Sequence, residues 1–291
     1  MMRAEQTRRQ FLQKVGIGAA ASLITAGSSS GQDQHPAEKE GPQGKCTSKR
    51  LFELGLASYT LREFDIDTTL AMTQRLGLKY IALKSFHLPL ESTPAEIETV
   101  AAKVRQAGLK LYGGGVIYMN DEAEVHHTFD YAKTAGMKVI IGAPKPELLG
   151  LVNKKVGEYE IKVAIHNHGP EDKLYPTPES VYKMIKDLDG RIGLCIDIGH
   201  TQRAGIDPSE AIERFAERLL DLHIKDVSAA TAEGTTVEMG RGVIDIPKVV
   251  RKLLKLNYAG IASFEFEKDE KDPLPGVAES VGYFRGVLAA I

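Results

Sequence analysis

The segment from Gly193 to His200, GLCIDIGH, is a short apolar run that ends in polar residues, and this pattern recurs through the second half of the chain. An apolar run of this length is typical of a buried strand. Three further segments end in the same way: KVAIHNHG at 162–169, LLDLHIKD at 219–226 and GIASFEFE at 260–267. In a closed parallel barrel the carboxyl ends of all strands meet at one mouth. The four segments therefore predict that their polar ends converge.

From about residue 51 onward, short apolar runs alternate with longer amphipathic segments, which predicts alternating strands and helices. The predicted strands are 54–59, 79–84, 109–114, 138–142, 161–166, 192–197, 220–225 and 260–265. The predicted helices are 68–76, 94–107, 122–135, 146–159, 178–188, 208–218, 246–256 and 277–290. Prolines in the first turn, as at Pro94 and Pro178, and glycines after the last turn, as at Gly77 and Gly108, are typical helix boundaries. Eight strand–helix repeats in this length predict an α/β fold, a (β/α)8 TIM barrel in a single domain over residues 51–291.

An open doubly wound sheet is the competing fold for such an alternation. That fold usually has a glycine-rich phosphate loop directly after its first strand. Here the first predicted strand runs into Ser58-Tyr59-Thr60, which contains no glycine. The glycines at 113–115 follow the third strand and lack the spacing of that loop. The barrel is therefore the favoured interpretation.

The first fifty residues differ from the rest and are not expected to belong to the fold. Arg8-Arg9, followed by Phe11-Leu12 and a modest apolar run at 15–26, resembles a twin-arginine export signal. The run is shorter than the roughly 20 apolar residues that a membrane span needs. We expect a twin-arginine signal peptide at 1–26, a disordered linker at 27–50, and a periplasmic or otherwise exported protein without stable membrane insertion after processing. The alternative is an amphipathic tail with a chance arginine pair.

The composition is that of an ordinary globular protein and excludes one class of partner. Of 291 residues, 43% are hydrophobic and 26% are charged, and the formal net charge is -2. Nucleic-acid binding usually needs a basic surface, so no nucleic-acid partner is expected. The two cysteines do not make a disulfide framework, since Cys195 lies in an apolar run, as a core residue does, and Cys46 lies in a polar segment. The oligomeric state stays open.

Histidines and carboxylates at the ends of four consecutive predicted strands form a candidate metal site. The predicted ligands are His166, Asp197, His223 and Glu265. Imidazole and carboxylate together suit one divalent ion, which could be Mn, Co, Fe, Zn or Mg. Two alternatives stay open here. His223 could be a core histidine with satisfied hydrogen bonds, and Glu267, two residues after Glu265 and on the same face, could replace it.

This set of residues resembles the xylose isomerase-like barrel superfamily, which includes sugar epimerases, inosose dehydratase-type enzymes and the endonuclease IV group. The resemblance covers about residues 51–291 and depends most on DIGH at 197–200, HIKD at 223–226, and the last strand ending in Glu265. It implies that Asp197, His223 and Glu265 hold a metal, and that His200 and Lys225 contact the substrate. One departure stands out. Where the family typically has Glu-Asn-His after strand five, this chain has His-Asn-His at 166–168.

The resemblance predicts a metal-dependent sugar isomerase or epimerase that acts by enediolate chemistry on an extracytoplasmic sugar or sugar derivative. In the family's epimerases two ligand glutamates also form the acid/base pair, and this chain lacks one of them. We therefore expect Glu265 to act as ligand and base, with His168 or His200 moving or orienting protons. A 3-keto-glycoside lyase or dehydratase working by β-elimination and a non-catalytic sugar-binding barrel are the alternatives. A phosphodiesterase acting on abasic DNA is disfavoured, because the chain has neither a basic groove nor ligands for several zinc ions.

Further polar residues near predicted strand ends could line a carbohydrate pocket. Lys84 and His87 follow the second strand, and Arg241 lies in the segment 229–245, which we expect to be an unstructured loop able to act as a lid. For Lys84, a lysine whose stem lies along apolar surface is the alternative. The pair His126-His127 lies in a helical segment with acidic neighbours, and we assign it to a solvated face.

Overall fold

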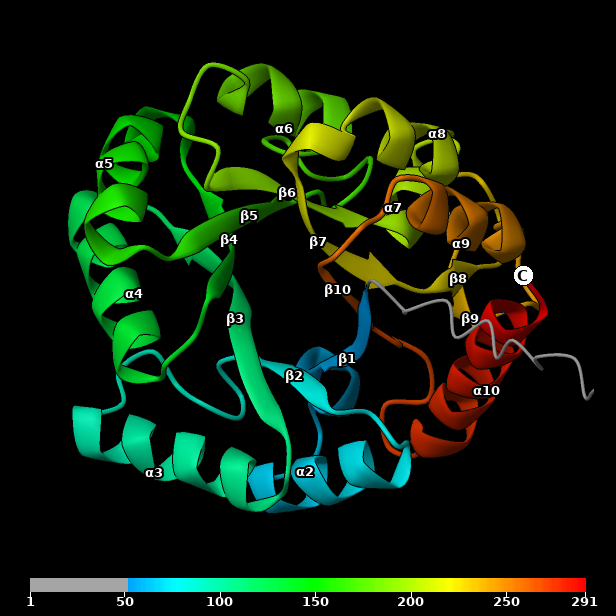
Figure 1. Ribbon diagram of the computed structural model, residues 1–291, viewed down its shortest axis with the longest axis horizontal. Coiled ribbons are helices and arrows are strands. Elements are labelled where there is room, and N and C mark those ends of the chain that lie inside the picture. Colours follow the sequence, from blue (N-terminus) through cyan, green and yellow to red (C-terminus); the bar gives the residue numbers. More distant parts are fainter. Residues whose placement is uncertain (1–51) are drawn as a thin grey trace, which may run out of the picture. The chain divides into compact units, whose positions relative to one another are not determined.

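Eight parallel strands close into a barrel, in the spatial order β1-β10-β7-β6-β5-β4-β3-β2 (Figure 1). The computed structural model describes residues 52–291, and the predicted signal peptide (1–26) and linker (27–50) lie outside them. The barrel strands are β1 (Glu53–Ala57), β2 (Tyr80–Leu83), β3 (Lys110–Met119), β4 (Val139–Pro144), β5 (Lys162–His166), β6 (Ile192–Asp197), β7 (Leu219–Ile224) and β10 (Ile261–Phe264). The predicted TIM barrel is confirmed.

Helices surround the barrel on its outside (Figure 1). They are α2 (Ile66–Arg75), α3 (Pro94–Gln106), α4 (Glu122–Thr134), α5 (Leu149–Tyr159), α6 (Pro178–Ile185), α7 (Ile198–Arg203), α8 (Pro208–Arg214), α9 (Ile246–Lys255) and α10 (Leu274–Ala290). Short 3-10 turns lie at η2 (Ser58–Leu61), η3 (Pro146–Leu148) and η4 (Ala216–Arg218). Within residues 52–291, every helix is too short or too polar to cross a membrane.

Side-chain caps set the helix starts that the sequence predicts. Thr93 accepts a hydrogen bond from Glu96 N and Glu96 bonds back to Thr93 N, which makes a capping box at the start of α3. Asp121 caps α4 in the same position by accepting from Glu124 N. Such caps satisfy main-chain N–H groups that have no partner inside the helix. Some differences from the prediction lie at element ends, since β3 continues to Met119 and η4 separates from α8. Three short elements were not predicted: α7, β8 (Asp226–Val227) and β9 (Thr236–Val237).

The register of the closed sheet decides which side chains point into the barrel together. His166 on β5 pairs with Cys195 on β6, and Asp197 on β6 pairs with His223 on β7. Ser263 on β10 also pairs with His223. Paired residues on neighbouring strands share a face of the sheet, so these side chains meet inside the barrel. The strand ends of the second half therefore share one polar layer at the mouth.

The predicted loop at 229–245 is irregular except at Thr236–Val237 (β9). It is anchored, however, because β9 pairs antiparallel with β8 (Asp226–Val227). The buried Asp226 carboxylate accepts hydrogen bonds from four main-chain N–H groups: Val227 at 2.9 Å, Gly240 at 2.9 Å, Gly242 at 3.1 Å and Ile244 at 3.1 Å. One carboxylate thus replaces the hydrogen bonds that regular structure would supply.

We predict that Asp226→Ala lowers the free energy of unfolding by about 3 kcal/mol, because it leaves buried N–H groups without an acceptor. Urea unfolding followed by circular dichroism measures this. Asp187→Ala is the matched control, since the Asp187 side chain is 87% exposed and its loss should change stability by less than about 0.5 kcal/mol. Equal stability of the two variants would contradict an anchoring role for Asp226.

Candidate metal and active site

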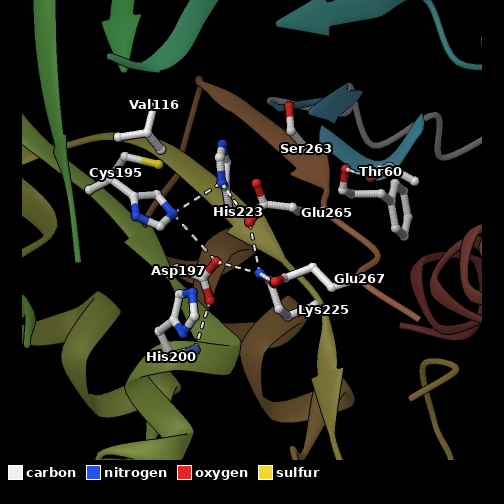
Figure 2. Close-up of polar contacts among 12 residues, drawn as sticks. Thr60, Val116, Cys195, Asp197, His200, His223, Lys225, Ser263, Glu265 and Glu267 are labelled. Carbon is white, nitrogen blue, oxygen red and sulfur yellow. Dashed lines mark hydrogen bonds and ion pairs between the residues drawn. The ribbon is translucent and has the colours of Figure 1, made fainter. Parts of the chain in front are cut away.

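Four buried side chains converge at the carboxyl ends of adjacent strands (Figure 2). They are His166 at the end of β5, Asp197 at the end of β6, His223 in β7 and Glu265 just after β10, called the tetrad below. One ligand atom from each lies within 4.8 Å of the others. His166 Nε2 is 3.1 Å from His223 Nδ1 and 3.5 Å from Asp197 Oδ2. His223 Nδ1 is in turn 3.2 Å from Glu265 Oε2. The structure therefore brings together the four predicted ligands.

The carboxylate of Asp197 is positioned by the start of α7, a helix that the sequence analysis did not predict. Its Oδ1 accepts a hydrogen bond from His200 N at 2.7 Å, which caps the helix. Asn167 Oδ1 accepts from Asp197 N at 3.0 Å, and Thr201 Oγ1 donates to Asp197 O at 2.6 Å. Because Oδ1 caps the helix, Oδ2 remains directed at the other three residues of the tetrad. The spacing in DIGH thus reflects a helix cap as well as a ligand.

Lys225 lies against the carboxylates of the tetrad. Its Nζ is 3.0 Å from Asp197 Oδ2 and 2.7 Å from Glu265 Oε2, and it also pairs with Glu267. Gly199 makes room for the lysine stem, since a Cβ at this glycine would lie 2.7 Å from Lys225 Cδ and still closer to Cγ. Burial alone would lower the pKa of Lys225, but the three carboxylates raise that pKa well above its usual range. Lys225 is therefore charged.

The tetrad fits a divalent ion in charge and in donor type. The two tetrad carboxylates carry two negative charges when the imidazoles are neutral. The adjoining Glu267 and Lys225 carry opposite charges and leave this total unchanged. Three buried atoms, Asp197 Oδ2, His166 Nδ1 and His223 Nε2, have no hydrogen-bond partner. The contact of Lys225 with Asp197 Oδ2 has ion-pair distance without hydrogen-bond alignment. Unpartnered buried polar atoms are costly unless a ligand satisfies them, so we assign the tetrad as the candidate metal site.

A cavity of about 290 Å³ opens over the tetrad. It is lined by Tyr59, Lys84, Val116, Tyr118, His166, His168, His200, Glu265 and Glu267. Tyr118 was not predicted as a site residue. Its ring stacks on that of His168 with centroids 5.7 Å apart. It reaches the mouth because β3 runs past the predicted end at residue 114. The uninterrupted apolar run VIYM at 116–119, directly after the glycines, was the available signal.

Residues 65–287 match the family described as xylose isomerase-like TIM barrel. The chain belongs to this family. Among curated proteins it is 27% identical over 145 residues to the rhizopine catabolism protein MocC of Rhizobium meliloti, which covers 45% of this chain and 44% of that protein. It is 28% identical over 142 residues to inosose dehydratase of Geobacillus kaustophilus, covering 43% of this chain and 44% of the relative. The chain thus matches less than half the length of these relatives.

Solved structures share the fold at low sequence identity. The IolI protein with a bound zinc atom has a TM-score of 0.68 at 16% identity, covering 82% of this chain and 99% of IolI. The 3-keto-D-glucoside 4-epimerase YcjR of E. coli has a TM-score of 0.66 at 15% identity, covering 81% of this chain and 99% of YcjR. A zinc-bound protein and a sugar epimerase therefore share this barrel architecture.

Of the four residues predicted to bind substrate in this xylose isomerase-like barrel, His87, Lys225 and Arg241 lie outside the lining of this cavity. Lys225 is held instead by the carboxylates that it contacts. His87 is buried, with Nδ1 2.9 Å from Ser58 Oγ and Nε2 3.0 Å from Thr69 Oγ1. Arg241 forms a two-point ion pair with Glu279 of α10, at 2.6 and 2.7 Å. It borders a separate, open hollow of about 600 Å³. His87 and Arg241 thus hold elements of the fold together, and sequence alone could not show their partners.

Three predicted polar residues, Lys84, His168 and His200, line the cavity. Lys84 Nζ donates to Val116 O at 2.6 Å, and burial lowers the pKa of Lys84. His200 Nδ1 accepts from Arg203 Nη1 at 3.1 Å, so a neutral His200 carries its proton on Nε2. His168 Nε2 lies 3.3 Å from Tyr118 Oη. These groups can donate to substrate oxygens or move protons.

His168 is the cavity histidine best placed to take up a proton. Burial lowers its pKa, which keeps it neutral near pH 7. Asp172 Oδ2, 3.0 Å from Nδ1, favours the positive charge that protonation would create. By contrast, although burial would raise the pKa of Glu265, Lys225 and His223 hold that pKa well below its usual range. Glu265 is therefore a weak base.

We predict that His223→Ala removes most of the bound metal, because it deletes one of two imidazole donors from the tetrad. Metal analysis of the purified full chain after loading and gel filtration measures the content. His126→Ala is the matched control, since His126 lies exposed on α4 and should keep one ion per chain. Full metal content in His223→Ala would show that the ligand assignment is wrong.

Proposed function

We propose that the protein is a metal-dependent sugar isomerase or epimerase that acts on the carbon next to a sugar carbonyl. The observation that supports this most is the tetrad of two imidazoles and two carboxylates at the mouth of the barrel, directly beneath a histidine-rich cavity. A divalent ion in such a site supplies Lewis-acid stabilisation of a developing oxyanion, worth several kcal/mol. The similar proteins include an epimerase and a dehydratase, and both of these reactions can begin with removal of a proton next to a carbonyl.

His168 is the proposed base of this reaction. Its neutral imidazole takes the proton from the carbon next to the carbonyl, the C–H electron pair forms the carbon–carbon double bond of an enediolate, and the carbonyl oxygen gains the negative charge. Asp172 stabilises the resulting imidazolium from 3.0 Å. Lys84 and the Nε2 proton of His200 face the same cavity and can hydrogen-bond to substrate oxygens. Return of the proton at another carbon or on another face completes isomerisation or epimerisation.

A β-elimination is the second candidate, and one observation favours it. The carboxylates that line the cavity, Glu265 and Glu267, are both paired with Lys225, so the described residues offer no free carboxylate as a second acid/base group. Elimination of a β-substituent from the enediolate needs only one base together with protonation of the leaving group. A 3-keto-glycoside is the substrate class for this reaction, because its glycosidic oxygen is attached to the carbon in the β position relative to the carbonyl.

We further propose that the substrate is extracytoplasmic. The support is in the sequence alone: the paired arginines at 8–9 with Phe-Leu at 11–12 precede a short apolar run. Sugar phosphates are cytoplasmic compounds, so an exported enzyme of this family would act on a neutral sugar or glycoside. Fractionation of cells that produce the full chain tests the export, and retention of all the protein in the cytoplasm would contradict it.

The decisive experiment is hydrogen exchange in heavy water with metal-free and metal-loaded full chain. We expect metal-dependent deuterium uptake at carbon from a panel of ketoses and 3-keto-glycosides, abolished by a chelator and restored by adding back the metal. A rearranged sugar would identify an isomerase or epimerase, and a released aglycone would identify a lyase. Chelator-insensitive sugar binding without exchange would instead show a non-catalytic sugar-binding barrel.

We predict that His168→Gln lowers the exchange rate by about 10²–10⁴, the usual contribution of a positioned general base. Metal content should stay at the wild-type level, because His168 is not one of the tetrad. His126→Gln, an exposed histidine on α4, should leave both quantities unchanged. A wild-type exchange rate in His168→Gln would exclude His168 as the base and leave Glu265 as the predicted base.

A further inference from the structure

Cys195 is a fully buried thiol placed beside two ligands of the tetrad. It lies on β6 in register with His166 on β5, so both side chains enter the barrel at the same level. Figure 2 shows its sulfur close to the tetrad, on the opposite side from Lys225 in that view. Ligand atoms of His166, Cys195 and His223 all lie within 4.8 Å of one another. These three residues form a second donor set, which shares both imidazoles with the tetrad.

Each of the two imidazoles has one nitrogen without a partner. His166 Nδ1 and His223 Nε2 are buried and have no hydrogen-bond partner. The thiol itself makes one weak polar contact, donating to Asp221 Oδ2 at 3.7 Å. Buried polar atoms are normally satisfied. Both imidazoles that lie beside Cys195 therefore have a nitrogen available to a ligand.

Charge separates the two sides of the site. On one side, the oxygens Asp197 Oδ2 and Glu265 Oε2 already lie 3.0 and 2.7 Å from the Lys225 ammonium, which a cation bound there must displace or share. On the side of Cys195, no described cation contacts the thiol or the two unpartnered nitrogens. A thiolate on this side therefore adds a ligand, next to the two shared imidazoles, for which Lys225 does not compete.

We propose that the thiolate of Cys195 joins His166 and His223 in holding the metal, which makes the site selective for zinc or cobalt over magnesium or manganese. This rests on the proposed metal-dependent function and deepens it. On binding, the S–H bond breaks, a sulfur–metal bond forms, and one proton leaves for the solvent; no oxidation state changes. Thiolate and imidazole ligands favour zinc and cobalt, whereas magnesium and manganese favour oxygen ligands.

Cobalt(II) loading of the metal-free full chain tests this directly. Bound cobalt in a site of low coordination number gives visible ligand-field bands, and a thiolate ligand adds a charge-transfer band in the near ultraviolet. We expect both in the wild type. Cys195→Ser and Cys195→Ala should lose the near-ultraviolet band, and zinc affinity should fall at least about tenfold, while magnesium affinity stays unchanged. Cys46→Ser is the matched control, because the chain has two cysteines, and it should keep the band.

The outcomes separate this inference from the function on which it rests. Bound cobalt without the near-ultraviolet band in the wild type, or a band that persists in Cys195→Ser, would overturn the role of Cys195 and leave the tetrad as the site. Loss of the band in Cys46→Ser would do the same. No bound cobalt at all would overturn the metal-dependent function as well. Far-ultraviolet circular dichroism of both Cys195 variants separates a lost ligand from a lost fold.

Discussion

The ammonium of Lys225 is the interaction that makes the rest of the site compatible with a folded barrel. It contacts the carboxylates of Asp197, Glu265 and Glu267, two of which are buried. Uncompensated buried charges of this kind are expensive, and removing one partner of such a group is strongly destabilising. The lysine therefore allows acidic ligands to gather at the mouth before any metal binds. Gly199 belongs to the same arrangement, because the stem of Lys225 occupies the space that a side chain at position 199 would fill.

The barrel topology turns separate sequence motifs into one site. β5, β6, β7 and β10 are consecutive in the closed sheet, so residues about a hundred positions apart become neighbours. The sheet fixes the backbone position of each ligand residue, and local hydrogen bonds then orient its side chain. Asp197 shows this most clearly, because one oxygen caps α7 and the other faces the tetrad. Asp226 organises the segment after β7 through its four main-chain hydrogen bonds.

The substitution at His166 changes the chemistry more than it changes the metal site. Two imidazoles and two carboxylates remain a sound donor set, yet a carboxylate that could serve as a second acid/base group is missing. The structure adds that Glu265 is held as a strongly ion-paired carboxylate, which lowers its basicity. In the mechanism that we propose, proton transfer falls to His168, which borders the cavity, has a pKa lowered by burial and lies beside Asp172. A site with one good base and a nearby thiol differs from a symmetric two-glutamate epimerase site both in the reactions it favours and in the metals it selects.

The sequence by itself determined the barrel and the positions of the tetrad, because both depend on local patterns: apolar runs of strand length, helix boundaries, and polar residues at strand ends. It also determined that Glu267 lies on the same face as Glu265. Only the tertiary structure decided which long or polar side chains reach the cavity. His87 and Arg241 have the right residue types near strand ends, but one is bound inside the fold and the other pairs with α10. Tyr118 enters the cavity because β3 runs longer than its glycines indicated, and Cys195 meets His166 because of inter-strand register. These outcomes depend on contacts with residues that are distant in sequence, and such residues become neighbours only when the barrel has closed.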